Sequence, residues 1–173
     1  GTFFADATLN LNSDPPVYDL TFKSGNFDIF PIAGVITSLN TNGSVKGTGF
    51  AVDQMNAQIV IDGNGSSIEN NMLDIIAIDA TASEKKINYT VLVNSDSTQI
   101  DLAGSFDFNI MEDPKYNLEG NLRHFNIGEL LQDTTSATNI NINLIAEGEG
   151  FNPDSMNLFI ISTLYESMIG DVR

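Results

Sequence analysis

Apolar and polar residues alternate one by one through most of this chain, and this alternation restricts its fold more than any other feature. In residues 99–110, one side carries Ile100, Leu102, Gly104, Phe106, Phe108 and Ile110. Asp101, Ser105 and Asp107 lie between them. A period of two is that of a β-strand with one apolar and one polar face. At about 3.3 Å per residue, we expect this strand to span roughly 35–40 Å.

The same alternation predicts further strands, each with a single apolar face. They lie near residues 3–11, 18–22, 45–50, 55–61, 73–80, 87–93, 116–122, 140–146 and 156–160. Asn42-Gly43 and residues 62–65 have the composition of tight turns, and short turns favour a meander of antiparallel neighbours. Two short helices are also predicted, one capped by Asp28 and one at residues 127–131.

An internal repeat is the second strong feature of the sequence. Residues 18–20 and 27–29 are similar to residues 116–118 and 125–127, at an offset of 98 (116 minus 18). At an offset of 101, residues 47–50 match 148–151, and Asp53, Met55, Asn56, Ile61 and Ile68 match Asp154, Met156, Asn157, Ile161 and Ile169. A unit that occurs twice in the same order predicts copies that stack on one another.

Charge and composition exclude several classes of function. The chain of 173 residues has 7 Lys plus Arg against 23 Asp plus Glu, a formal charge of −16. Nucleic acid is therefore not an expected partner, because binding to phosphates depends on basic side chains. The absence of cysteine removes disulfides, thiolate catalysis and cysteine-ligated zinc. Both ends of the sequence interrupt a strand-like pattern, so we expect a fragment of a longer protein.

Two architectures fit strands that are apolar on one face only. The first is a long, curved antiparallel sheet with a half-open groove and one or two short helices. The alternative is a closed β-sandwich, in which two apolar faces meet. The repeat favours the open sheet, because a unit that stacks needs open ends. We therefore predict a single elongated all-β domain over residues 1–173, with related units at about 18–70 and 116–169 joined by a meander at 71–115.

Three short motifs, F-[DN]-[IL], G-x-G-[FY] and D-x-[ML]-[NS], occur twice in the same order. They lie at residues 27–29, 47–50 and 53–56, and again at 125–127, 148–151 and 154–157. This order of motifs resembles that of the AsmA/TamB-like family of bridge-type proteins. The resemblance implies a taco-shaped sheet whose apolar inner groove shields lipid acyl chains. Members span the space between the two bacterial membranes and are associated with phospholipid transport and, in some cases, with outer-membrane protein assembly.

The expected groove is lined by the apolar residues of the alternating segments. These are Tyr18, Leu20, Phe22, Met55, Ile59, Ile61, Ile87, Tyr89, Val91, Ile100, Leu102, Phe106, Phe108, Leu118, Leu122, Ile140, Ile142, Leu144, Met156, Leu158 and Ile160. The expected partners are phospholipid acyl chains, neighbouring β-repeats of the parent chain, an outer-membrane barrel protein and a second copy of the fragment. The resemblance implies a periplasmic location, with the parent protein anchored in the inner membrane of a Gram-negative bacterium.

Other kinds of site have weaker support in the sequence. A catalytic triad would need His124, which has no nucleophile motif near it. Asp101 and Asp107 could form the carboxylate pair of a glycosidase, but they are better explained as part of the solvated face of a strand. Residues 62–65 have the residue types of a calcium loop without its spacing. We therefore expect no enzymatic activity, no metal and no cofactor. The alternative function is a structural or adhesive exported β-repeat module with a closed core and no bound lipid.

Overall fold

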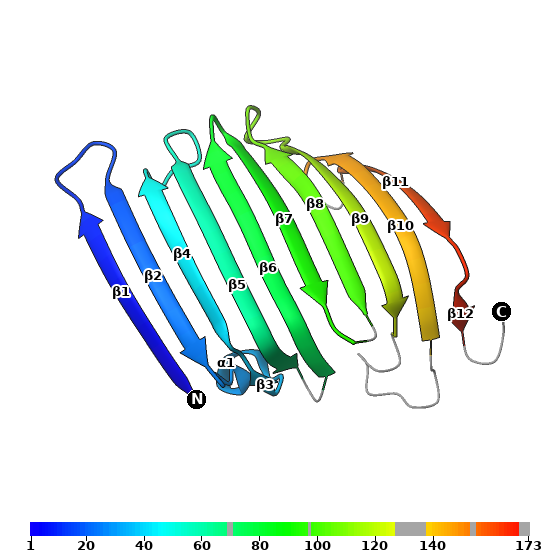
Figure 1. The fold of residues 1–173 in the computed structure, drawn as a ribbon. Helices are drawn as coiled ribbons and strands as arrows, with labels where there is room; N and C mark the ends of the chain where they lie inside the picture. The colour runs from blue at the N-terminus through cyan, green and yellow to red at the C-terminus, as the bar shows by residue number, and fades with distance from the viewer. Residues whose placement is uncertain (69–70, 97, 127–137, 153–154, 170–173) are drawn as a thin grey trace.

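A computed structural model describes residues 1–68, 71–96, 98–126, 138–152 and 155–169 of the chain as one open antiparallel β-sheet (Figure 1). The sheet has 12 strands, and the order along its main path is β1-β2-β4-β5-β6-β7-β8-β9-β10-β11. The two short strands β3 and β12 pair with β5 and β10. The order of the main path follows the chain, so each strand of this path lies beside the previous one on it.

The strands match the segments in which apolar and polar residues alternate. They are β1 (Thr2–Asn10), β2 (Val17–Gly25), β3 (Thr37–Ser38), β4 (Thr41–Thr48), β5 (Asn56–Ile68), β6 (Asn71–Ser83), β7 (Lys86–Asn94), β8 (Gln99–Asp107), β9 (Lys115–Phe125), β10 (Thr138–Glu149), β11 (Asn157–Leu164) and β12 (Met168–Ile169). The prediction of a long, curved antiparallel sheet is confirmed (Figure 1).

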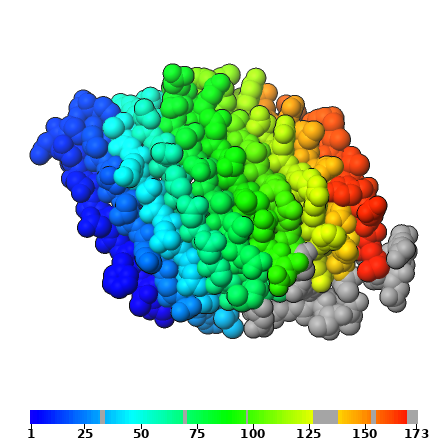
Figure 2. Space-filling view, viewed as in Figure 1, coloured from blue at the N-terminus to red at the C-terminus, as the bar shows by residue number. Residues whose placement is uncertain are grey.

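The alternative of a closed sandwich is wrong. Among the described residues, β1 pairs with β2 and β11 pairs with β10, and these two outer strands do not pair with each other. Each strand of the main path is added beside the last, and β1 and β11 stay at opposite ends of the path. The colours of Figure 2 follow one another across the visible face in chain order, as expected of a single layer of neighbouring strands.

Three local predictions are also wrong. The strand predicted to reach Ile110 ends at Asp107, whose Oδ1 accepts hydrogen bonds from the backbone N–H of Asn109 (2.9 Å) and from its side-chain Nδ2 (2.7 Å). This local turn competes successfully with continued pairing. The turns predicted at Asn42-Gly43 and at residues 62–65 lie inside β4 and β5. Gly43 makes room for the ring of Phe22 on the neighbouring strand, and Gly65 adopts a positive φ within β5.

One short helix, α1 (Phe30–Ala33), is present in the described residues, and the helix predicted at residues 127–131 lies outside them. Asp28 does not cap α1 in the predicted way, because Ile29 occupies the N-cap position. Instead Asp28 Oδ1 accepts hydrogen bonds from the backbone N–H of Phe30 and of Thr37, each at 3.0 Å. The carboxylate thereby joins the two ends of the loop that contains α1.

A polar corner joins three strands at one end of the sheet in the first sequence repeat. Asn40 Oδ1 accepts a hydrogen bond from the backbone N–H of Asn26 (2.9 Å), and Asn40 Nδ2 donates to the backbone oxygen of Gly65 (2.7 Å). The backbone N–H of Asn40 donates to Ser66 Oγ at 3.0 Å. Asn26 and Gly65 both have positive φ, at 49° and 62°. The corner therefore stabilises two irregular strand positions at once.

The same corner recurs in the second repeat, with equivalent residues at the offsets found in the sequence. Asn141 Oδ1 accepts from the backbone N–H of His124 (2.9 Å), and Asn141 Nδ2 donates to the backbone oxygen of Glu166 (3.1 Å). The backbone N–H of Asn141 donates to Ser167 Oγ at 2.9 Å. His124 and Glu166 again have positive φ, at 53° and 45°.

The other end of the strands repeats as well. In the first copy, the backbone N–H of Gly49 donates to the oxygen of Pro16 (2.8 Å), and the rings of Tyr18 and Phe50 stack with centroids 5.3 Å apart. In the second copy, Gly150 donates to Pro114 (2.9 Å), and Tyr116 stacks on Phe151 (5.5 Å). By these equivalences β4 corresponds to β10, and β5 corresponds to β11.

Candidate functional site

An uninterrupted ladder of apolar residues crosses the whole sheet. Residues directly opposite each other in antiparallel strands point to the same face, so the register of each pair shows which side chains share a face. The central ladder is Ala7, Leu20, Val45, Ile59, Ala80, Tyr89, Gly104, Leu118, Ala146 and Ile160. We call the face that carries this ladder the apolar face, and the other side of the sheet the polar face.

Two parallel ladders on the apolar face flank the central one. One runs Ala5, Phe22, Gly43, Ile61, Ile78, Val91, Leu102, Gly120, Leu144 and Ser162. The other runs Leu9, Tyr18, Gly47, Ala57, Ala82, Ile87, Phe106, Tyr116, Gly148 and Leu158. Ser162 is the single polar residue in these two ladders. Apart from it, the apolar face is continuous from β1 to β11.

The extent of the apolar face follows from sheet geometry. Nine interstrand spacings of about 4.8 Å give a length of roughly 43 Å, and three ladders with their flanking residues cover a width of about 20 Å. The resulting footprint of roughly 850 Å² exceeds the few hundred Å² typical of the largest apolar patch on a monomer. A continuous apolar surface of this size is unusual on a monomeric protein.

The structure places the predicted groove residues on the apolar face wherever they lie in strands. Besides the residues of the three ladders, Ile100, Leu122 and Ile142 belong to it, because Ile100 pairs with Leu122 and Leu122 with Ile142. Ile140, opposite Phe125, follows beyond a register shift. Met55, Phe108 and Met156 lie outside the strands, and the ring of Phe108 lies 6.2 Å from that of Phe106.

Several residues of the apolar face were not predicted. Val45, Ile76, Ile78 and Val93 belong to it by register, as do the apolar residues of β1 other than Phe4, which lies opposite Lys23 on the polar face. In β6 both faces carry apolar side chains, so alternation did not show which side belongs to the apolar face. The pairing of Ile78 with Ile61 and Val91 decides this, and pairing is not visible in the sequence.

In several inner strands the apolar face is less exposed than the polar face, although every described element except α1 belongs to the sheet, whereas β1 and β11 are exposed on both faces. In β2, Leu20 and Phe22 are half-buried, whereas Asp19 and Thr21 are exposed. The same contrast recurs along β7 and β9. Curvature brings side chains closer together on the inner side of a sheet, so we infer that the apolar face is the inner side.

Glycines on the apolar face lie opposite large side chains. Gly43 is opposite Phe22, and Gly148 is opposite Tyr116, and in both pairs the aromatic ring occupies the space that a Cβ on the glycine would need. The ring therefore lies across the neighbouring backbone instead of standing up from the sheet. Such pairs are a known way to stabilise glycine in strands, and here they keep the inner surface shallow.

Aromatic rings gather where β8 ends and β9 begins. The ring of Phe106 lies 5.6 Å from that of Tyr89, 6.4 Å from that of Tyr116 and 6.0 Å from that of Phe151. Burial raises the pKa of the Tyr89 hydroxyl above its usual value of 10.0. The cluster is thus apolar enough to disfavour charge.

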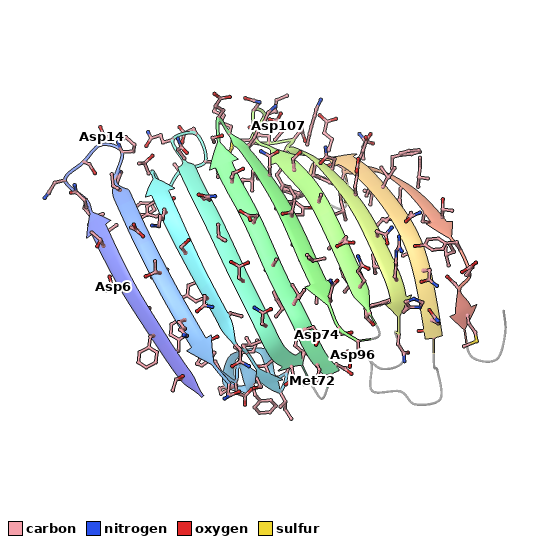
Figure 3. The ribbon with its side chains drawn as sticks, in the orientation of Figure 1. Asp6, Asp14, Met72, Asp74, Asp96 and Asp107 are labelled. Carbon is pink, nitrogen blue, oxygen red and sulfur yellow. The ribbon has the colours of Figure 1, made fainter. Side chains whose placement is uncertain are left out.

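The polar face carries ionic and amide side chains. Lys46 Nζ lies 3.3 Å from Asp19 Oδ2, and Lys86 Nζ lies 3.4 Å from Asp107 Oδ2, both between directly opposed residues. Carboxylates lie at both ends of the strands (Figure 3): Asp107 at one end is on the polar face, whereas Asp74 of β6, at the other end, is on the side of the apolar face, two residues before Ile76. The formal charge of −16 is therefore compatible with a sheet whose polar face is exposed to solvent.

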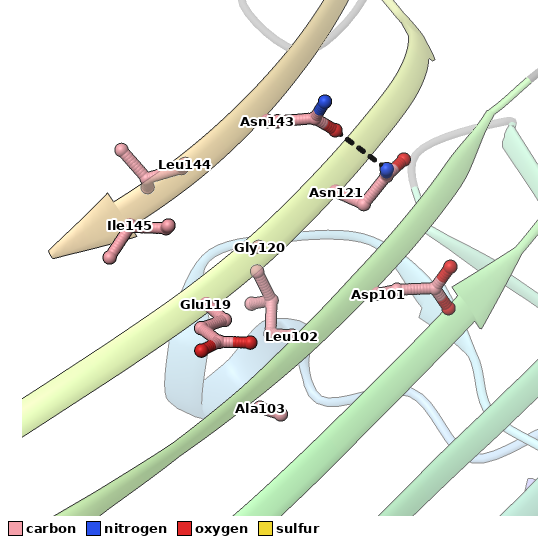
Figure 4. Close-up of a pocket in the computed structure, with 9 residues that line it drawn as sticks. All are labelled: Asp101, Leu102, Ala103, Glu119, Gly120, Asn121, Asn143, Leu144 and Ile145. Atoms are coloured by element: carbon pink, nitrogen blue, oxygen red, sulfur yellow. Dashed lines mark hydrogen bonds between the residues drawn. The ribbon is translucent and has the colours of Figure 1, made fainter. Parts of the chain in front are cut away.

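A shallow hollow on the polar face spans β8, β9 and β10 (Figure 4). Its floor is at Gly120, and Asn121 Nδ2 donates to Asn143 Oδ1 at 2.7 Å on one side. Asp101 and Glu119 also line it. The hollow is open, and its lining residues include no basic, hydroxyl or thiol side chains. The lining therefore does not resemble a catalytic or anion-binding site.

Chemical sites are not evident elsewhere in the described part of the chain. Those residues contain no group of three or more His, Cys, Asp or Glu side chains placed to hold a metal ion. His124 Nδ1 lies 3.3 Å from Asn139 Oδ1, within the second polar corner. The pKa of Asp28 is lowered by the backbone N–H groups of Phe30 and Thr37, and that of Asp107 by the N–H of Asn109.

Two further findings complete the description. Within the described ranges, no helix has the length and apolar character needed to cross a membrane. Comparison of the chain with protein-family models, with curated proteins and with solved structures finds no match.

Proposed function

We propose that this chain is a segment of an apolar groove that shields the acyl chains of phospholipids from water. In this proposal the segment belongs to a periplasmic protein that bridges the inner and outer membranes of a Gram-negative bacterium. The observation that supports it is the apolar face, whose central ladder crosses each strand of the main path of an open sheet, perpendicular to the strands. Support for the bridge arrangement comes from the motif order described above.

The physical basis of the proposal is transfer of hydrocarbon out of water. Burial of one methylene group is favourable by about 0.8 kcal/mol, so even half-burial of an acyl chain on this face would stabilise it by several kcal/mol. The ladders continue from one strand to the next without a charged residue. An acyl chain aligned with them would meet a similar surface at each position, and no catalysed step is required.

The competing proposal, an adhesive module with a closed core, does not fit an open sheet. It requires the apolar face to be covered by a second layer, and the described residues form one open layer. Two copies of the chain that covered each other's apolar faces would restore such a core, and the experiment below separates this case.

The test is site-specific photo-crosslinking with p-benzoylphenylalanine. Tyr89 and Phe106 are replaced on the apolar face, and their neighbours Thr90 and Ser105 are replaced on the polar face as matched controls. Each protein is irradiated with detergent-solubilised phosphatidylethanolamine and examined by mass spectrometry. We expect phospholipid adducts at Tyr89 and Phe106 and at least ten-fold less adduct at the two controls.

Other outcomes would contradict the proposal. Equal labelling at the two faces would indicate non-specific contact with detergent micelles. Protein–protein adducts at Tyr89 and Phe106 without lipid adducts would indicate a closed dimer core. A Val91→Asp variant, compared with Thr90→Asp, adds a second readout. If Val91→Asp unfolds the chain and the wild type carries no lipid, the apolar face is an ordinary core.

A further inference from the structure

We propose that the free edge of β11 (Asn157–Leu164) is an acceptor for an added β-strand with the residue pattern of β6 (Asn71–Ser83). The added strand would extend the sheet by antiparallel pairing, a mode of recognition in which backbone hydrogen bonds supply much of the affinity. This proposal is independent of lipid binding, because it depends on the edge of the sheet and not on its apolar face.

The equivalence of β11 with β5 identifies the kind of strand that fits. β5 begins at Asn56 and β11 at Asn157, an offset of 101. The serine of a polar corner follows each start at the same distance, Ser66 within β5 and Ser167 just after β11. One edge of β5 pairs with β4, and one edge of β11 pairs with β10, the equivalent strand. The other edge of β5 is covered by β6. The corresponding edge of β11 has no partner strand among the described residues.

The composition of β11 indicates an edge that is normally covered. Its sequence, NLFIISTL, contains no charged residue and no proline. On the polar face, Phe159 is 60% exposed and Ile161 is 48% exposed. Edge strands that face water are usually protected by lysine, proline or a bulge. The absence of such protection favours an occupied edge.

The register of β5 and β6 specifies the side chains of the added strand. Ile59 is opposite Ala80, and Ala57 is opposite Ala82. Applied to β11, this register places a small residue opposite Ile160 and another opposite Leu158, the positions equivalent to 59 and 57. Ser162, equivalent to Ile61, would then lie opposite a large residue such as Ile78. On the apolar face, the accepted strand therefore carries a large apolar residue at the position of Ile78. Small residues follow two and four positions later, where β6 has Ala80 and Ala82.

The experiment places such a strand where the repeat predicts it. Residues 172–173 are replaced by a copy of the β6 sequence, NMLDIIAIDATAS. In the control protein the apolar-face residues of that copy are exchanged by Ile76→Ala, Ile78→Ala, Ala80→Ile and Ala82→Ile, which preserves composition and length. Hydrogen–deuterium exchange is then measured for the amides of β11 in both fusions and in the unmodified chain.

We expect amides of β11 to exchange at least ten-fold more slowly in the β6 fusion than in the control fusion. Phe159→Lys together with Ile161→Lys should abolish that difference, while exchange in β5 to β8 remains unchanged and shows that the sheet is intact. Equal exchange in the two fusions would refute the proposed pattern. Slow exchange at β11 in the unmodified chain, with a dimer in sedimentation velocity, would also refute it, because a second copy would then occupy the edge.

Discussion

Replacement of Asn141 by alanine should destabilise the protein by about 2–4 kcal/mol. Asn141 is 5% exposed, and its side chain accepts from the backbone N–H of His124 (2.9 Å) and donates to the backbone oxygen of Glu166 (3.1 Å). The alanine variant leaves both backbone groups without these partners, at a cost of about 1–3 kcal/mol each. Positive φ at His124 and Glu166 makes both positions intrinsically unfavourable, so the two hydrogen bonds of the Asn141 side chain also offset backbone strain there.

The equivalent residue of the first repeat provides the matched control. Asn40 makes the same two hydrogen bonds, at 2.9 Å to the N–H of Asn26 and at 2.7 Å to the oxygen of Gly65. Asn40 is more exposed than Asn141, so water can replace its side chain, and Asn40→Ala should cost only about 1 kcal/mol. Asn141→Asp keeps the acceptor and loses the donor, and we expect an intermediate cost.

Urea unfolding followed by far-ultraviolet circular dichroism measures these differences. A lower midpoint with an unchanged slope would show loss of stability without a change in the surface exposed on unfolding. The reasoning is refuted if Asn141→Ala costs less than about 0.5 kcal/mol, or if Asn40→Ala costs more than Asn141→Ala.

Three further predictions test other parts of the sheet. Gly148→Ala should destabilise by about 1–3 kcal/mol, because the new methyl group would displace the Tyr116 ring, and thermal unfolding monitors it. Gly65→Ala should cost only about 1 kcal/mol in the same assay, since its Cβ meets no atom within 4 Å and only its φ of 62° is unfavourable. Asp28 should titrate below its ordinary pKa of 3.8, as followed by NMR at the Thr37 amide; its contribution to stability is then present above pH 4 and is lost as the pH falls through the lowered pKa. A midpoint at or above 3.8 would contradict the hydrogen bonds assigned to this carboxylate.

Local prediction from the sequence succeeded where alternation was clean. Residues of β8 such as Ile100 and Leu102 alternate with polar neighbours, and a period of two leaves only a strand with one apolar face. Local prediction failed where a glycine suggested a turn. Asn42-Gly43 has the composition of a turn, yet Gly43 lies within β4 because the ring of Phe22 in β2 occupies the space beside it. No local pattern reveals a partner that lies two strands away in the sequence.

The sequence by itself determined that this protein is a sheet with one apolar and one polar face, because side-chain direction in a strand depends only on position along the chain. It also contained the repeat, since equivalent residues such as Asn40 and Asn141 recur in order. Only the tertiary structure decided that the sheet stays open and that the apolar residues align into ladders. Both properties depend on interstrand register, and register is set by contacts between residues far apart in the chain.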